Sequence, residues 1–485
     1  MPIIKRKEII EVIVDDIVYG GNGIVKYKNN TIENFIIFVK NGIEGQKLRV
    51  EITKVKPNYA ESKIIEVIKK SKYQNKINYQ KISGAPYIEL STSYQINKKK
   101  SIVIDTFNKI PEIKKVENYL DEFIESPSQW HYRNKMEYAF SSITYDQKRK
   151  KDIDGFGLGF KKENTWWMVE NLDKDSGLFD EKWENSLYKI RDYCVQTELP
   201  AWNIPQKKGF YRNLNVRKSF KDNKLLVELV TSSLYSQNFN MQNFCEYVIS
   251  IHKDRIGGII HTINDNISDK IDYNKVQSKL YYGESVINES ILGLNFEISM
   301  SSFFQTNPKC AEKLYNKVVE YTLDKYTIQE QNSIILDLFC GTGTIAQLLA
   351  SRIDTAKVIG VDIVQSSIKN AKNNAIKNNI DNVEFQALDI KDFLIKNPLL
   401  KDKINIIIID PPRSGVSKKS IKRIISLNAK TIIYVSCNPS TQSRDISLFI
   451  NAGYTLNQFS IVDQFPHTHH IETIFVLIKQ DISYL

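Results

Sequence analysis

Short alternations of apolar and polar residues fill the first part of the chain. They are clearest over 9–14, 35–39 and 48–52, and Gly20-Gly21-Asn22-Gly23 interrupts them as a turn. Such alternation predicts strands with one buried face, and several short strands separated by turns predict a small β-barrel. The spacing leaves SH3-like and OB-like barrels both open. We predict a barrel domain over residues 1–67.

The C-terminal third has a different pattern. From Ser333 onward, short apolar runs alternate with helical stretches, which is typical of a parallel sheet covered by helices. A last pair of strands follows without a long crossover and predicts an antiparallel edge pair. We therefore expect an α/β domain with a Rossmann-like sheet over residues 291–485. The predicted strands are 334–339, 358–362, 383–387, 404–410, 431–436, 460–463 and 473–478.

Residues 68–290 mix strands and helices without a repeat, which predicts a mixed α+β central domain. The segments 130–135 and 211–217 combine aromatic residues with arginine. Arginine and tyrosine can hold phosphates and stack on unpaired bases, which favours RNA binding. A half-buried strand with arginine on its wet face gives the same pattern, so both interpretations stay open.

Composition narrows the class of protein. Of 485 residues, 42% are hydrophobic, enough for several ordinary cores. The first residues are charged where a signal peptide is apolar, and the apolar runs are strand-sized, so we expect no membrane association. Five scattered cysteines without a Cys-x-x-Cys pair argue against disulfides and favour a reducing cytoplasm.

The formal charge of +11 suits a polyanionic partner such as RNA. Lysine clusters occur at 69–72, 98–100 and 148–151. The sequence is also rich in Ile, Asn and Lys throughout, and this bias alone raises the lysine count. Charge by itself therefore leaves nucleic-acid binding and a solvated surface equally open.

A glycine-rich turn follows the first strand of the C-terminal domain, in the run 336–344 that contains Gly341 and Gly343. Glycines at such a turn let a ligand approach the backbone at the start of a helix, so we expect a mononucleotide-like cofactor here. Asp362 ends the next strand, where a carboxylate can accept the ribose hydroxyls. The pair fits NAD and S-adenosylmethionine (SAM) equally.

The motifs at the ends of two later strands favour SAM over NAD as the cofactor. The fourth strand ends in Asp410-Pro411-Pro412-Arg413, and Asp-Pro-Pro at this edge of a sheet indicates a methyltransferase. The next strand ends in Ser436-Cys437-Asn438-Pro439, which presents a cysteine at the same edge. A lone cysteine at a strand end is usually inert core. The neighbouring motifs make Cys437 a candidate for chemistry.

Five motifs in this order resemble the RNA uracil-5-methyltransferases, a family of ribosomal and transfer RNA 5-methyluridine enzymes. The resemblance covers nearly the whole chain. It implies a class I SAM-dependent methyltransferase that acts on RNA, and it identifies the N-terminal barrel as a TRAM domain. The motifs lie at 303–307, 337–344, 410–413, 436–439 and 463–472.

The expected chemistry needs these residue types, because C5 of uracil is a poor nucleophile until a group adds to C6. The resemblance implies that Cys437 is this nucleophile and that Glu472 is the base that removes the C5 proton. A dry pocket would raise the pKa of Glu472 into a useful range. The SAM pocket is expected to include Gln305, Phe339, Gly341, Gly343, Thr344, Asp362, Asp389 and Asp410. Relatives often carry asparagine in place of Thr344 and Asp389.

No metal centre is predicted. Many ribosomal members of the family hold an iron–sulfur cluster on cysteines of the central domain. The corresponding stretches here, 81–86 and 169–172, contain no cysteine, so we expect no cluster. The histidines His467, His469 and His470 lack partner ligands at the spacing of a metal site.

Three alternatives remain. A base amino-methyltransferase normally has an aromatic residue where Arg413 stands and has no use for Cys437. A catalytically silent RNA-binding factor would not need both Cys437 and Glu472, and a nicotinamide oxidoreductase would need a third glycine in the turn. The barrel and the chain length favour ribosomal RNA, specifically that of the large subunit, as substrate, with transfer RNA as the alternative. We expect a cytoplasmic monomer.

Overall fold

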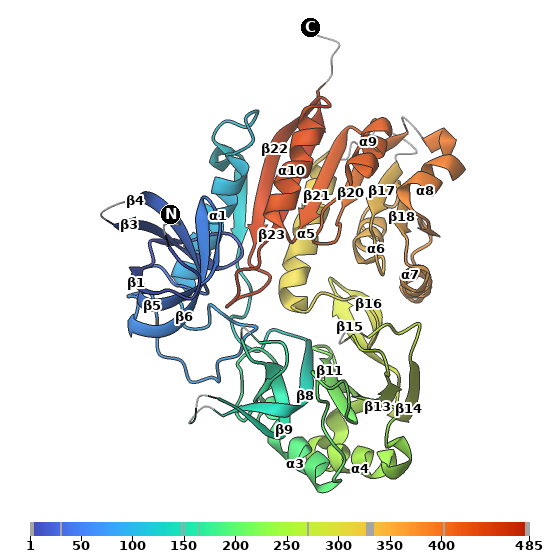
Figure 1. Cartoon of the computed structure of the whole chain (residues 1–485). Coiled ribbons are helices and arrows are strands. Elements are labelled where there is room, and N and C mark those ends of the chain that lie inside the picture. The colour runs from blue at the N-terminus through green and yellow to red at the C-terminus, as the bar shows by residue number, and fades with distance from the viewer. Residues whose placement is uncertain are drawn as a thin grey trace.

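The computed structural model describes residues 4–29, 32–146, 149, 151–163, 165–268, 271–325, 334–400 and 403–480. Lys148 and Lys150 of the third lysine cluster and Ser333 lie outside these ranges. Figure 1 shows three parts: the N-terminal strands in blue, a central part in green, and a large sheet in gold to red. Within the ranges given, every helix is too short or too polar to span a membrane.

The N-terminal part is a closed barrel, as predicted. Its interior is filled by alternate residues, for example Leu48, Val50 and Ile52. The chain after β1 joins both edges of the sheet, because the Val14 amide donates to Gln46 O and the Asp15 amide donates to Ile24 O. Its strands, in the order β1-β5-β6-β4-β3-β2, are β1 (Ile9–Ile13), β2 (Asp16–Ile17), β3 (Asn22–Asn29), β4 (Ile32–Lys40), β5 (Lys47–Val55) and β6 (Tyr59–Lys69).

The central part is a seven-stranded sheet that shares one core with the helices α2 (Glu181–Glu184), α3 (Leu187–Gln196) and α4 (Met241–His252). Trp183 of α2 and Phe244 of α4 are fully buried in that core. The strands, in the order β10-β9-β8-β11-β12-β13-β14, are β8 (Lys135–Asp146), β9 (Lys151–Lys161), β10 (Val169–Asn171), β11 (Tyr211–Lys218), β12 (Leu225–Thr231), β13 (Ile256–Ile263) and β14 (Gln277–Gly283).

The arginines of the segment 211–217 are buried, which overturns both interpretations that the sequence left open for them. Arg212 is 3% exposed, and its guanidinium donates to the carbonyls of Asn264 and Asn266. Arg217 is also 3% exposed and donates to the carbonyl of Met300. Each guanidinium donates to backbone carbonyls of another segment and so links that segment to β11. These side chains therefore hold the fold together and do not face RNA.

The C-terminal part is built on an eight-stranded sheet in the order β19-β18-β17-β20-β21-β23-β22-β7. The first five strands in this order are parallel, and β23 is antiparallel to β21 and β22, as predicted. The prediction that β22 and β23 form the edge of the sheet is wrong, because β7 pairs with β22 beyond them. The strands of the C-terminal third are β17 (Ile334–Leu338), β18 (Lys357–Asp362), β19 (Val383–Ala387), β20 (Ile404–Ile409), β21 (Thr431–Ser436), β22 (Tyr454–Val462) and β23 (Glu472–Lys479).

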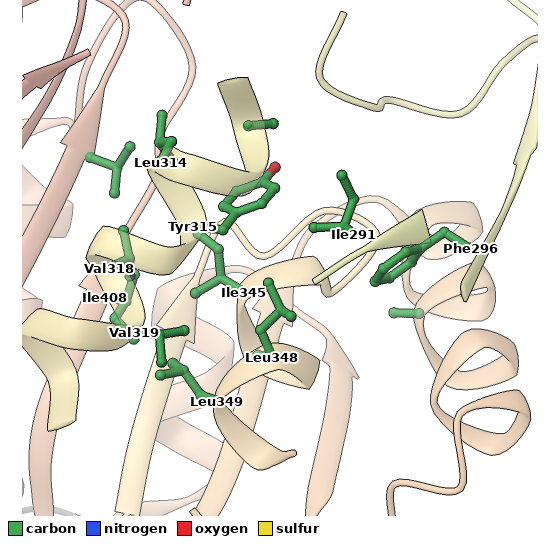
Figure 2. Packing of buried hydrophobic residues seen from close by; sticks show 14 of the residues in the cluster. Ile291, Phe296, Leu314, Tyr315, Val318, Val319, Ile345, Leu348, Leu349 and Ile408 are labelled. Carbon is green, nitrogen blue, oxygen red and sulfur yellow. The ribbon is translucent and has the colours of Figure 1, made fainter. Parts of the chain in front are cut away.

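Both faces of this sheet are buried, which explains its continuous apolar runs. In β20, Ile406 and Ile408 belong to the core on one face, and Ile407 and Ile409 belong to the core on the other. Figure 2 shows the first core, where α5 and α6 pack together. The helices flanking the sheet are α5 (Pro308–Lys325), α6 (Thr344–Ala350), α7 (Gln365–Lys377), α8 (Ile390–Lys396), α9 (Lys418–Ser426) and α10 (Pro439–Ile450).

The structure differs from the predicted domain boundaries in two places. β7 (Leu120–Ile124) pairs with β22 and forms the edge of the large sheet, and Phe107 of α1 (Thr92–Phe107) stacks on Phe475 at 4.2 Å. Much of the segment 92–124 thus packs with the C-terminal part and not with the central one. The boundary at 291 also divides the hairpin of β15 (Val286–Ile291) and β16 (Leu294–Ser299), which packs near α6 (Figure 2).

Candidate active site

The predicted catalytic residues lie at the carboxyl edge of the large sheet. Cys437 directly follows β21, and Glu472 is the first residue of the neighbouring strand β23. The antiparallel register pairs Ser436 with Thr473, so the next two positions along the ladder are 437 and 472. Residues opposite each other in such a ladder have Cβ atoms about 4.5–5.5 Å apart. The thiol and the carboxylate therefore belong to one site.

Burial controls the ionisation of this site. Burial, with the charges of Glu472 and Asp410, raises the pKa of the Cys437 thiol to about 11, against the opposing charge of Arg413. Burial also raises the pKa of Asp410 to about 7. It raises the pKa of Glu472, which is 4% exposed, well above the usual value, and the charge of Asp410 adds to this. The direction of this pKa shift agrees with the dry pocket expected for Glu472, and the role of Glu472 as base stays a prediction.

Hydrogen bonds tie the loop after β20 to the loop after β21. Asn438 donates from Nδ2 to Arg413 O at 2.9 Å, and its Oδ1 accepts from the Ser440 amide at 3.1 Å, which caps α10. The Arg413 side chain is exposed, and its Nη2 lies 3.5 Å from His470 Nε2. The residue that follows Cys437 is therefore fixed, while the Arg413 side chain stays accessible.

The glycine turn after β17 lies against Asp362, as the sequence predicted. Asp362 Oδ2 accepts from the Gly341 amide at 3.0 Å. Gly343 adopts φ of +75°, and a Cβ at this position would lie 2.5 Å from the ring of Phe385. Phe339 also has a left-handed backbone, with φ of +62°, a strained conformation that occurs preferentially at functional sites. A Cβ built at Gly341 would meet nothing within 4 Å, so the turn is open on that side.

Asp337 is a residue whose role the sequence did not predict. It is fully buried in β17, one of its carboxylate oxygens accepts from the Ala346 amide at 3.1 Å, and the other has no hydrogen-bond partner. A buried acceptor without a donor is costly unless a ligand supplies one. The only signal in the sequence was its place at the head of the glycine motif. Burial raises its pKa well above the usual value.

The contacts of the other predicted pocket residues do not point to a ligand. Gln305 Oε1 accepts from Gln464 Nε2 at 3.5 Å, and Thr344 is buried at the start of α6. Asp389 is exposed, and its carboxylate caps α8 by accepting from the Asp392 amide at 2.8 Å. This capping contact accounts for an aspartate at 389 without any ligand. The ligand-binding roles of Gln305, Thr344 and Asp389 stay predictions.

Helix α1 and the central part both hold the segment 463–471, which leads into Glu472. Lys99 of α1 forms a buried ion pair with Asp463 at 2.5 Å. From the central part, Tyr132 donates to Pro466 O at 2.9 Å, and the ring of Trp130 stacks on His467 at 3.9 Å. In Figure 1 this segment is the red loop below β23, where the three parts meet. The aromatic segment 130–135 thus contributes to the placement of Glu472.

The histidines of this segment have structural contacts. Burial lowers the pKa of His467 to about 4 and that of His470 to about 3, so both rings are neutral at pH 7. The His467 amide donates to Gln95 of α1. Over the ranges of the chain that are described, no three His, Cys, Asp or Glu side chains are grouped to hold a metal ion.

A glutamine links the two cysteine-free stretches of the central part. Gln80 Oε1 accepts from the amides of Asp173 and Lys174, and its Nε2 donates to Asn171 O at 2.6 Å. The loop before residues 81–86 is thereby attached to the strand end at 169–172. Side-chain hydrogen bonds thus connect these loops.

Comparison with known proteins identifies the family. The sequence profile of the TRAM domain matches residues 5–65, and that of the tRNA (uracil-5-)-methyltransferases matches residues 271–480. A Clostridium tetani protein described as an "uncharacterized RNA methyltransferase" is 35% identical over 98% of this chain and 99% of its own length. The chain belongs to the RNA uracil-5-methyltransferase family. A similar relative from Caldanaerobacter subterraneus is 33% identical over 98% of this chain and 99% of its own length.

A solved structure has the same fold. It is the Pyrococcus abyssi tRNA (uracil-54, C5)-methyltransferase in complex with S-adenosyl-L-homocysteine. The TM-score is 0.73 at 23% identity, over 96% of this chain and 99% of that one. The predicted combination of a TRAM barrel with a Rossmann-like methyltransferase domain is confirmed for this member of the family.

Proposed function

We propose that the enzyme methylates carbon 5 of a uridine in RNA, with SAM as methyl donor, Cys437 as nucleophile and Glu472 as base. The observation that carries this proposal is the register of β21 and β23, which ends with Ser436 opposite Thr473, so that residues 437 and 472 follow directly at the same end of the ladder. Membership of the uracil-5-methyltransferase family supports the same reaction.

The residues of the chain account for each bond change on the uracil ring. Cys437 loses its proton to solvent, and its thiolate adds to C6, which makes C5 a nucleophile. After C5 has taken the methyl group, Glu472 removes the C5 proton. The electrons of that C–H bond restore the double bond between C5 and C6 as the bond from sulfur to C6 breaks. The thiolate is regenerated, and each turnover releases one proton through Glu472.

The glycine turn fits SAM. The unpaired carboxylate oxygen of buried Asp337 offers an acceptor, and the space beside Gly341 is open. Asp362 would hold the ribose hydroxyls, and Asp410 would lie between the cofactor and the target base. When bound, SAM supplies an electrophilic methyl group to C5.

For the substrate class, the expectation from the sequence is ribosomal RNA, and it rested on the barrel and the chain length. Transfer RNA is a second candidate that a specific observation favours. The likeness to the archaeal transfer RNA enzyme covers 96% of this chain, which is too much to leave out the barrel. The barrel therefore does not discriminate between the two RNAs, and both must be tested.

The test is nucleoside mass spectrometry after incubation of the protein and SAM with unmodified ribosomal or transfer RNA. We expect 5-methyluridine with one of the two. Cys437→Ala should make none while binding SAM as before, and Cys245→Ala, in a buried cysteine of α4, should match the wild type. A methylated purine as product, or normal turnover by Cys437→Ala, would refute the proposal.

A further inference from the structure

The turn between β2 and β3 of the barrel reaches the catalytic edge. Tyr19 in this turn donates from its hydroxyl to Asn438 Oδ1 at 2.8 Å, although the two residues are 419 positions apart. Asn438 directly follows Cys437. The Tyr19 ring packs against a core cluster of the large sheet and not against the core of the barrel. Tyr19 is thus part of the surroundings of the thiol.

The same turn also contacts the segment that carries Glu472. Gly21 has φ of +80°, and a Cβ at this position would lie 2.9 Å from Nδ1 and 3.2 Å from Cγ of His469. Gly20 has a similar backbone, with φ of +90°, but a Cβ there would meet nothing within 4 Å. Close approach to the His469 ring therefore depends on the absence of a side chain at 21. One turn of the barrel touches both catalytic loops.

Polar contacts with α1 fix the barrel in this position. Asp16, three residues before Tyr19, pairs with Lys98 of α1. Lys98 also lies 3.3 Å from Glu44 of the barrel, and Glu44 accepts from the Tyr94 hydroxyl at 2.7 Å. Because α1 packs against the large sheet, these contacts hold the turn in register with the catalytic edge.

We propose that the barrel turn 18–21 is a positioning element of the active site. Asn438 Oδ1 accepts from Tyr19 and from the amide of Ser440, and its Nδ2 donates to Arg413 O, so Tyr19 restrains the loop that presents Cys437. Gly21 restrains His469 in the loop before Glu472. The barrel then contributes to the chemical step as well as to RNA affinity. This inference rests on the proposed function of Cys437 and Glu472.

Tyr19→Phe removes the hydroxyl and keeps the ring. Loss of one hydrogen bond that orients the reacting loop should lower the single-turnover rate about 2- to 10-fold at saturating RNA and SAM. The dissociation constants for RNA and SAM should stay within twofold of the wild type. Tyr27→Phe, at a half-buried tyrosine of β3 in the same barrel, is the matched control and should change neither rate nor binding.

The glycine pair provides a second test with an internal control. Gly20→Ala and Gly21→Ala impose comparable backbone strain, because both residues have a left-handed φ. Only Gly21→Ala crowds His469, so it should slow turnover several-fold more than Gly20→Ala at a similar loss of thermal stability. Equal rates for the two variants would overturn the inference.

Wild-type protein and Cys437→Ala in the same assay separate the two proposals. If the wild type forms no 5-methyluridine, the proposed function fails and the inference fails with it. If the wild type is active and Tyr19→Phe is as fast, or if Tyr19→Phe changes only RNA affinity, the barrel turn has no positioning role and only the inference is refuted.

Discussion

Replacing Glu472 with glutamine keeps the size of the side chain and removes the proposed base. Two effects follow from the structure. A general base contributes about 10²- to 10⁴-fold to a proton transfer, so release of the methylated uridine should slow by about that factor. The carboxylate of Glu472 also raises the pKa of Cys437, so its removal should lower the pKa of the thiol and leave the attack on C6 as fast or faster.

The substitution should therefore slow release of the methylated uridine but leave the attack on C6 as fast or faster. Together the two effects predict that a covalent protein–RNA complex accumulates. End-labelled RNA and SAM should convert most of the Glu472→Gln protein into an RNA adduct that survives a denaturing gel, while multiple-turnover methylation falls at least 100-fold. The adduct should be absent from the double variant that also carries Cys437→Ala.

A buried carboxylate elsewhere provides the control. Glu289 in β15 is 2% exposed, and burial raises its pKa as well. Glu289→Gln should therefore test the general effect of losing a buried carboxylate, and we expect normal turnover and no adduct. If Glu472→Gln forms no adduct and turns over normally, Glu472 is not the base and the reasoning from the strand register is wrong.

Two further predictions concern pH and stability. The single-turnover rate should rise between pH 6 and pH 8, because the thiolate fraction of Cys437, with a pKa of about 11, grows roughly tenfold per pH unit over this range. A flat profile of the single-turnover rate against pH would contradict this. Lys99→Met leaves Asp463 buried without its cation, which should lower the free energy of unfolding by about 3–5 kcal/mol, and an unchanged denaturant midpoint would show that the ion pair is not needed.

The parts of the fold that the sequence predicts correctly are those with strong local patterns. The run Ile404–Ile409 is almost entirely isoleucine because both faces of β20 are covered. This pattern can be recognised in the segment alone, without knowledge of the strands that pair with it. Asp362 and the glycine turn were also predictable, since strand ends of a parallel sheet meet at one edge. In contrast, the pattern at Leu120–Ile124 indicates a strand but not the sheet that it joins.

Side-chain roles that depend on distant partners could not be predicted. An arginine on a strand has the same local pattern whether it meets a phosphate or a buried carbonyl, so Arg212 was ambiguous until its partners at Asn264 and Asn266 were known. Tyr19 had no signal at all, because its partner lies 419 residues away. Asp337 was in the right motif, but only its unpaired oxygen distinguishes it from a structural aspartate.

The position of β7 in the large sheet has a consequence for synthesis of the protein. Leu120 pairs with Phe459, so at about 5–20 residues per second the ribosome needs roughly 20–70 s to make the partner of a strand that already exists. During that interval β7 is an unpaired edge that can join a wrong sheet. Asp121 and Glu122 place negative charges on this strand, and both lie within 3.3 Å of Lys317 once the sheet is complete. These charges discourage premature pairing, and the large sheet is completed only after β22 (Tyr454–Val462) has been made.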